Sequence, residues 1–250
     1  MSNHKTMQKQ NQIYELFLKP GKHILILVDP DKFDAGEAEK IFRKLNSLAD
    51  MVLVGGSLLS ETRTEKVIDE IRKVTDLPVV LFPGNAMQVT EKADAILFLQ
   101  LISGRNPEFL ISQHVHAAPL IARTSLEVIP TSYILIDGGK RTSVEYISQS
   151  MPVPADKTDI AVATALAGKF LGHKLIYLEA GSGALNAVPA DIVKAVSSKT
   201  NLPVIVGGGI RDEKTALDLF SAGANSIVIG SLFETNPDAV LRIAQQIRNH

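Results

Sequence analysis

Three small-residue segments in the second half of the sequence have the composition of a phosphate-binding site. They are Tyr177-Leu-Glu-Ala-Gly-Ser-Gly183, Gly207-Gly-Gly-Ile210 and Val228-Ile-Gly-Ser231, and each one begins in or follows a short apolar run. Glycine lets the backbone approach an oxyanion closely and turns several N–H groups toward one point. Glycine also simply ends strands, but three such segments in succession favour a phosphate pocket.

The first of these segments carries an acidic residue, Glu179, in strand alternation with Tyr177. A carboxylate that faced a phosphate would repel it, so we expect Glu179 to accept a hydrogen bond from a substrate hydroxyl. In that position it would select the substrate and is a candidate general base. The alternative is a buried glutamate paired with a core arginine or lysine, because unpaired burial of a charge is costly.

Acidic and hydroxyl side chains follow the first two apolar runs, in Val28-Asp-Pro-Asp-Lys32 and Val54-Gly-Gly-Ser57. Mg²⁺ typically binds one or two carboxylates together with waters and substrate phosphates, and Asp29 at a strand end suits that role. Ser57 can join it as a metal ligand or donate to a phosphate oxygen. The structural alternatives are a plain Asp-Pro turn, with Asp31 as its cap, and Ser57 as the N-cap of the next helix.

Other polar residues carry weaker signals. Lys140 and Arg141 can bind a diphosphate or lie in a solvated loop, and Arg105 has the same two interpretations. The histidines show no metal-ligand spacing. His114 and His116 stand two residues apart, and we expect a solvated surface pair.

Eight short β-rich runs position these residues, and segments with helical apolar spacing lie between most of them. Strands that alternate with helices imply parallel pairing, and eight such units close into a (β/α)8 TIM barrel. We expect one barrel domain over residues 1–250, with residues 1–12 as a flexible N-terminus. The predicted strands are Ile24–Val28, Met51–Val54, Val79–Phe82, Ala95–Leu99, Tyr133–Ile136, Leu175–Leu178, Val204–Val206 and Ser226–Ile229.

Two connections depart from a regular barrel. The segment Asn85–Asp94 is short for a helix, so one barrel helix after the third strand is expected to be missing or replaced by a loop. The connection Leu101–Ser132 is long, with a helix predicted over Asn106–His114, near whose first turn Pro107 lies, and it is expected to line a groove. Asn106 can also cap that helix. A further helix is predicted over Asp159–Leu171.

Composition limits the classes of partner. The chain has 250 residues and is 45% hydrophobic, and its 26 Lys and Arg against 27 Asp and Glu leave a formal charge of −1. No basic field exists to attract nucleic acid or an anionic membrane. The absence of cysteine excludes disulfides and thiolate metal sites. Without a signal peptide or an apolar run of spanning length, we expect a soluble cytoplasmic protein with no stable membrane insertion.

Together these motifs resemble the family of geranylgeranylglyceryl phosphate synthases and heptaprenylglyceryl phosphate synthases, from about Gly21 to Phe233. The string that begins at Tyr177 is the most specific part. The resemblance implies a modified barrel and a transferase that joins a prenyl group, most closely geranylgeranyl, to the C3 hydroxyl of sn-glycerol 1-phosphate and releases diphosphate. It also implies Mg²⁺ dependence, a bacterial-like member of the larger subgroup, and a homo-oligomer, either a dimer or a hexamer.

The resemblance further implies residue roles. Asp29 and Ser57 look like the magnesium ligands, and Asp29, Tyr177 and Glu179 like the catalytic residues. Two positions depart from the pattern: Ser231 stands where many members have asparagine, and Leu27 where some bacterial members have a lysine that Lys32 is a candidate to replace. The residues that match the glycerol phosphate site are Tyr177, Leu178, Glu179, Ala180, Gly181, Ser182, Gly183, Gly208, Gly209, Gly230 and Ser231.

The prenyl tail would need an apolar groove along the barrel side, which the segment Ile96–Ile102 and the irregular third helix are expected to provide. Two other classes remain open. One is a phosphate barrel that isomerises or cyclises a sugar phosphate, which needs an acid and a base across the mouth and no lipid groove. The other is a non-catalytic scaffold that binds a phosphate ligand.

Overall fold

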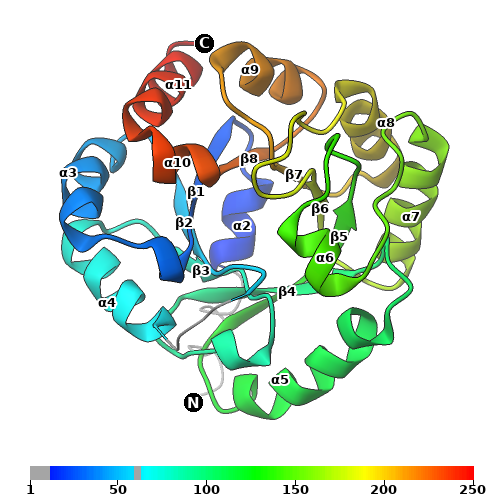
Figure 1. The fold of residues 1–250 in the computed structure, drawn as a ribbon, viewed down its shortest axis with the longest axis horizontal. Coiled ribbons are helices and arrows are strands. Elements are labelled where there is room, and N and C mark those ends of the chain that lie inside the picture. Colours follow the sequence, from blue (N-terminus) through cyan, green and yellow to red (C-terminus); the bar gives the residue numbers. More distant parts are fainter. Residues whose placement is uncertain (1–11, 59–62) are drawn as a thin grey trace, which may run out of the picture.

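Eight parallel strands form a closed barrel in the computed structural model, which describes residues 12–58 and 63–250 (Figure 1). Each strand pairs with its neighbours in chain order, and β8 closes the barrel against β1. The predicted barrel is confirmed. The strands are β1 His23–Val28, β2 Met51–Val54, β3 Val79–Leu81, β4 Ala95–Leu101, β5 Glu127–Leu135, β6 Leu175–Glu179, β7 Val204–Gly207 and β8 Ser226–Ile229.

The largest difference from prediction concerns β5, which begins at Glu127 instead of Tyr133. Its first half contains a charged residue and Pro130, a combination typical of a loop. In the structure Pro130 pairs in register with Phe98 of β4, and its carbonyl accepts a hydrogen bond from the N–H of Lys174 at 2.8 Å. The proline needs no backbone donor there, so the strand continues through it.

A ring of helices surrounds the barrel (Figure 1). Helix α3 shows why they form: Asp34 caps its N-terminus by accepting a hydrogen bond from the N–H of Glu37 at 2.9 Å, and its buried residues recur with helical spacing. The helices are α2 Gln12–Leu18, α3 Ala35–Leu45, α4 Thr64–Val74, α5 Gln113–Ile121, α6 Ser143–Ser148, α7 Thr158–Phe170, α8 Ala190–Thr200, α9 Glu213–Ser221, α10 Ser231–Thr235 and α11 Pro237–Asn249.

Two apolar layers hold the fold together. The outer layer lies between strands and helices and includes Phe42 and Ile176, and the inner layer fills the barrel and includes Leu53 and Tyr177. Because both faces of most strands are buried, those strands read as continuous apolar runs instead of alternating ones. Four consecutive residues of β2 are buried, for example.

The connection after β3 is the irregular part of the barrel. Between Leu81 and Ala95, all of which is described, the only helical element is a single 3-10 turn at Ala86–Gln88, so the predicted loss of a helix is confirmed. The next connection begins with a π-helix at Glu108–Ser112 that runs into α5 and ends at Ile121, beyond the predicted His114. The N-cap position of this segment is Pro107, and Asn106 supports its start from one residue earlier, because its Oδ1 accepts from the N–H of Glu108 at 3.0 Å.

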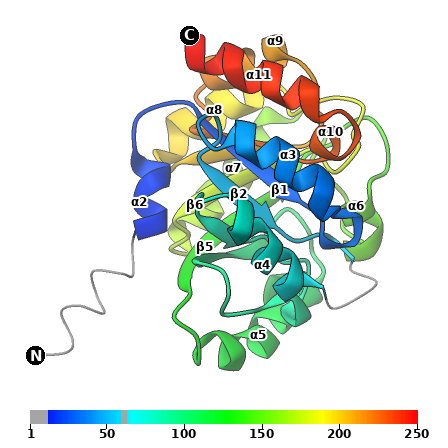
Figure 2. The same ribbon diagram turned by 90° about the vertical axis from the view of Figure 1, so that its left-hand side faces the viewer.

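Helix α2 covers the end of the barrel opposite α6 and α10 (Figure 2). Ile13 and Phe17 are buried in the inner apolar layer. The carboxylate of Glu127, itself buried, accepts from the N–H groups of Ile13 and Tyr14, each at 2.8 Å. Gln12, expected to be flexible, is thus helical, and the rest of that expectation concerns residues 1–11, which lie outside the described residues.

In the described part of the chain, no helix combines the length and apolarity required to cross a membrane.

Glu127→Gln is expected to lower the free energy of unfolding by roughly 2 kcal/mol, because a neutral amide accepts the two N–H groups more weakly than a carboxylate does. Urea unfolding measures the change. Glu15→Gln, an exposed position on the same helix, is the control and should cost much less. Equal losses in the two variants would show that Glu127 does not anchor α2.

Candidate functional site

A pocket with about 1540 Å³ of empty space opens at the carboxyl ends of the strands. In a TIM barrel this is the end where active sites are built. Most of the predicted site residues meet there. Those that line the pocket are Asp29, Ser57, Tyr177, Glu179, Ser182, Gly183, Gly208, Gly209, Gly230 and Ser231.

Three predicted residues lie behind the pocket wall. Leu178 and Ala180 are fully buried in the outer apolar layer, so their side chains pack between strand and helix. The N–H of Gly181 donates to Oε1 of Glu179 at 2.6 Å. These residues therefore shape the pocket through the backbone.

Glu179 ends β6 inside the barrel and is 5% exposed. Burial raises the pKa of its carboxyl group to about 7, although the N–H of Gly181 and the hydroxyl of Tyr177 beside it act in the opposite direction. No arginine or lysine among the described residues pairs with it, so the alternative of a core ion pair is wrong. A carboxyl group that titrates near neutral pH is suited to take a proton from a hydroxyl.

Glycines on β7 and just after it make room for this carboxylate. A Cβ on Gly207 would come 2.8 Å from Oε2 of Glu179 and closer still to the hydroxyl of Tyr177. A Cβ on Gly208 would come 2.5 Å from Oε1, and its φ of +82° is a conformation that favours glycine. Side chains at either position would displace the carboxylate.

The predicted phosphate loops meet on the β6 to β8 side of the pocket. The hydroxyls of Ser182 and Ser231 are 3.0 Å apart. Gly183 and Gly209 have φ values of +72° and +71°, as expected for backbone that turns its N–H groups out of strand geometry. This side therefore offers hydroxyls and accessible backbone, with the carboxylate of Glu179 at the end of β6 beside them.

Residues from neighbouring loops support the β6 loop. The carbonyl of Gly138 accepts from the N–H groups of Leu185 and Asn186 at 2.9 and 3.0 Å. Nζ of Lys140 lies 3.7 Å from the point that a Cβ on Gly183 would occupy. Arg141 instead pairs with Glu145 at 3.4 Å. Of the two predicted cations, Lys140 is thus the one that lies near Gly183 in the β6 loop.

The part of the pocket at the ends of β1 and β2 carries Asp29 and Ser57. Asp29 itself caps the 3-10 turn Pro30–Lys32 by accepting from the N–H of Asp31 at 3.1 Å, so Asp31 is not the cap. Its carboxylate also faces Gly56, whose Cβ would lie 3.4 Å from Oδ1. Ser57 does not cap the next helix, which begins at Thr64 with Arg63 before it.

Lys32 forms ion pairs with two carboxylates. Its ammonium group lies 2.9 Å from the carboxylate of Glu234 on α10 and 3.5 Å from that of Asp29. Burial lowers the pKa of Lys32, but the hydrogen bond to Glu234 and the charge of both carboxylates raise it overall. Lys32 therefore orients Asp29 at the pocket wall, which Leu27 also lines.

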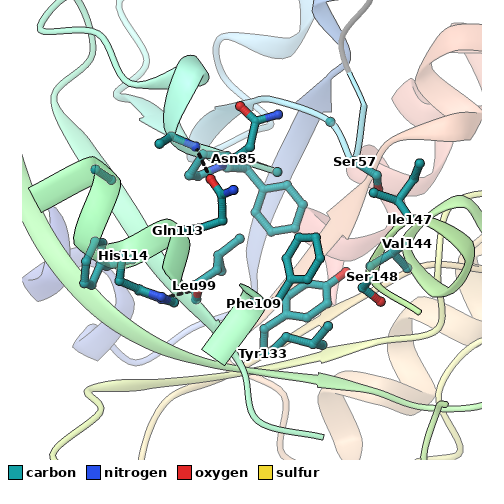
Figure 3. Close-up of a pocket in the computed structure, with 18 of the residues that line it drawn as sticks. Ser57, Asn85, Leu99, Phe109, Gln113, His114, Tyr133, Val144, Ile147 and Ser148 are labelled. Atoms are coloured by element: carbon teal, nitrogen blue, oxygen red, sulfur yellow. Dashed lines mark hydrogen bonds between the residues drawn. The ribbon is translucent and has the colours of Figure 1, made fainter. Parts of the chain in front are cut away.

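An apolar groove with about 800 Å³ of empty space adjoins the mouth pocket on the side where the barrel helix is missing, and both cavities are lined by Ser57, Phe82 and Tyr133. Residues of β4 line it, as predicted for the segment Ile96–Ile102. Phe109 and Gln113 close it from the long crossover (Figure 3). The missing helix thus leaves space for a long apolar ligand.

His114 also lines this groove, contrary to the expected surface pair. Its ring packs edge-on against Phe98 at 4.7 Å, and its Nε2 lies 2.8 Å from the carbonyl oxygen of Leu99. Burial lowers its pKa, so the ring is neutral near pH 7. His116 is exposed as predicted. The two residues lie on a helix, where a spacing of two places them on different faces.

Sequence reasoning did not single out Phe82, Tyr133 or Glu234, which also line the mouth pocket. Phe82 ends a predicted strand, and this position at a carboxyl end is the signal that was available for it. Tyr133 opens the predicted strand Tyr133–Ile136, so its predicted place was at the wrong end of the barrel. Glu234 gave no such signal, because it follows β8 on the short helix α10.

Comparisons with known proteins agree with this geometry. A model of the PcrB family matches residues 18–247. A geranylgeranylglyceryl phosphate synthase of Spirosoma linguale is 46% identical over 228 residues, 91% of this chain and 92% of the relative. One of Chitinophaga pinensis is 42% identical over 242 residues, 95% of this chain and 96% of the relative.

A solved structure extends the similarity to three dimensions. The crystal structure of (S)-3-O-geranylgeranylglyceryl phosphate synthase from Thermoplasma acidophilum in complex with substrate sn-glycerol-1-phosphate has a TM-score of 0.86. It is 31% identical, and the match covers 98% of each chain.

Glu179→Gln is expected to stabilise the protein increasingly as pH rises. Between the ordinary pKa of 4.5 and the folded value of about 7, the folded protein keeps a proton that the unfolded chain releases, so wild-type stability falls through this window. Glutamine does not ionise. The advantage of the variant in free energy of unfolding should grow by roughly 2–3 kcal/mol between about pH 4 and pH 8, measured by urea unfolding. An advantage that does not change with pH would contradict the assignment.

Proposed function

The chain belongs to the PcrB family, and from this premise we propose that it is a prenyltransferase that joins sn-glycerol 1-phosphate to a long prenyl diphosphate. The observation that carries the proposal is that two cavities lie side by side and share Ser57, Phe82 and Tyr133 in their walls. The mouth pocket offers a carboxylate and glycine loops, and the groove that adjoins it is apolar. One substrate is small and polar and the other is long and apolar, so each matches one cavity.

The acceptor occupies the β6 to β8 side of the mouth pocket. Its phosphate lies at Gly183, Gly209 and the hydroxyls of Ser182 and Ser231, which approach one another at 3.0 Å. Its C3 hydroxyl reaches the carboxylate of Glu179. A phosphate at the carboxylate would be repelled, so the charges fix the orientation of the molecule.

The donor places its tail in the groove and its diphosphate beside Ser57, which lines both cavities. A tail of geranylgeranyl length is the best match to the relatives, which are named as geranylgeranylglyceryl phosphate synthases. Burial of the tail against apolar walls provides most of its affinity.

The oxygen ligands that Asp29 and Ser57 offer fit Mg²⁺. Asp29 provides one carboxylate and Ser57 a hydroxyl, and the described residues contain no group of three or more His, Cys, Asp or Glu side chains that would enclose a metal alone. Mg²⁺ commonly binds in this way, with one or two carboxylates and substrate phosphates. When bound, it would neutralise charge on the leaving diphosphate.

The reaction breaks the bond between C1 of the donor and its diphosphate oxygen, and both electrons leave with the diphosphate. The C3 oxygen of the acceptor forms the ether bond to C1. Its proton passes to the carboxylate of Glu179, whose raised pKa of about 7 makes it a stronger base than an exposed glutamate. Holding the two substrates in adjoining cavities supplies much of the rate.

The purified protein is expected to convert labelled geranylgeranyl diphosphate and sn-glycerol 1-phosphate into a labelled lipid that extracts into organic solvent, with Mg²⁺ present. The same assay with prenyl diphosphates of other lengths measures the specificity for the donor, and with sn-glycerol 3-phosphate it measures the specificity for the acceptor. A sugar phosphate isomerase or a binding scaffold would give no labelled lipid with any donor. The predicted homo-oligomeric state and cytoplasmic location stay predictions.

Asp29→Asn is expected to lower the transfer rate at least about 100-fold, because a group that stabilises the leaving diphosphate is lost. Asparagine retains the side-chain oxygen that caps the turn at Pro30, so the thermal midpoint should change little. Asp156→Asn, at an exposed position, is the control. A folded and fully active Asp29→Asn protein would remove Asp29 from the mechanism.

Lys140→Gln is expected to raise the KM for glycerol phosphate roughly fivefold, with less change in kcat, because a cation near Gly183 in the β6 loop is lost. Arg141→Gln is the matched control, since Arg141 is exposed and pairs with Glu145. Steady-state kinetics at low and high salt measure both variants. The role of Lys140 is refuted by unchanged KM values or by equal increases in the two variants.

A further inference from the structure

Two aromatic rings stand where the mouth pocket joins the groove. Phe82 and Tyr133 line both cavities, and their ring centroids are 6.0 Å apart with planes inclined at 50°. Tyr177 adds a third ring on the mouth side, 5.1 Å from Phe82 and 5.4 Å from Tyr133. These three rings are called the aromatic junction below.

The strand register fixes this cluster. Tyr133 and Tyr177 face each other in the pairing of β5 with β6 and stack at 25°. Phe82 follows β3 directly, and its N–H donates to the carbonyl of Val54 at 2.9 Å. The pairing of these strands therefore fixes the backbone positions from which the three rings project.

The reacting carbon of the donor has to lie at this junction. Under the proposed function, the tail fills the groove and the acceptor hydroxyl lies at Glu179, so C1 of the donor lies between them. Ser57, where the diphosphate is placed, also lines both cavities. As the C1–O bond breaks and its electrons leave with the diphosphate, positive charge spreads over the allylic carbons until the acceptor oxygen bonds to C1.

Neutral aromatic rings attract a cation at their faces, most strongly where water is excluded. Burial raises the pKa of Tyr133 and of Tyr177 well above the usual value for tyrosine, and the charge of Glu179 acts in the same direction. Both phenols are thus uncharged at neutral pH. Such rings stabilise a passing cation without forming a bond to it.

We infer that the ring faces of Phe82 and Tyr133 stabilise the allylic cation that develops on the prenyl donor, which makes them catalytic residues of this site. The inference rests on the proposed function. It adds a role for apolar side chains to a site whose other groups act on phosphate, metal and hydroxyl.

Fluorinated phenylalanines at position 82 test this role, because fluorine withdraws electron density from the ring face and changes its shape little. Mono-, di- and trifluorinated residues are introduced in turn, and single-turnover rates are measured with geranylgeranyl diphosphate and sn-glycerol 1-phosphate. The logarithm of the rate should fall steadily with the number of fluorines, to about tenfold below wild type for the trifluorinated ring. The KM for the donor should change less than about twofold.

The same series at Phe98 is the control. That ring lines the groove but not the mouth pocket and packs against His114, so it contacts the tail instead of the reacting carbons. The inference would be overturned if the single-turnover rate did not change with fluorination at Phe82, or if it fell equally at Phe98. Either result would leave the proposed function intact. If the unmodified protein forms no ether lipid, the proposed function fails and the inference fails with it.

Discussion

A carboxylate buried inside a barrel without a cation beside it is unfavourable for stability, and the rest of the mouth is arranged around this one group. Glu179 is held by the N–H of Gly181 and lies beside the hydroxyl of Tyr177. Gly207 and Gly208 leave it room, which no residue with a Cβ would do. Under the proposed function, the nearby Gly183 and Gly209 open the backbone toward the acceptor phosphate, so acceptor binding and the base would depend on neighbouring small residues.

The groove follows from a second constraint, on barrel construction. A regular (β/α)8 barrel covers every strand with a helix. Here the chain passes from β3 to β4 with only the turn Ala86–Gln88, and the long crossover before β5 closes the gap from a distance. The apolar side of β4 therefore lines a cavity that joins the mouth at Phe82 and Tyr133. Under the proposed function, the missing helix thus provides a cavity for the prenyl tail beside the pocket for glycerol phosphate.

The eight strands and the missing helix could be predicted from the sequence, because buried parallel strands read as apolar runs and Asn85–Asp94 is too short for a helix. The meeting of the three glycine segments in one pocket could also be predicted, and phosphate binding by them stays a prediction. Interactions between residues at the ends of different strands could not be predicted from the sequence. The pairing of Lys32 with Glu234 and the junction of Phe82 with Tyr133 depend on barrel closure, which brings residues from different strands together. The first half of β5 was missed because Pro130 signals a loop when its partners are unknown.

The pH dependence of kcat/KM for sn-glycerol 1-phosphate tests the central claim most directly, since this quantity reports ionisations of the free enzyme. If the carboxylate of Glu179 is the base, kcat/KM rises with pH up to about 7, the pKa of this group in the folded protein, and is constant above it. Glu179→Gln should lose both the activity and this inflection. A wild-type profile that is flat from about pH 5 to pH 9 would contradict the account.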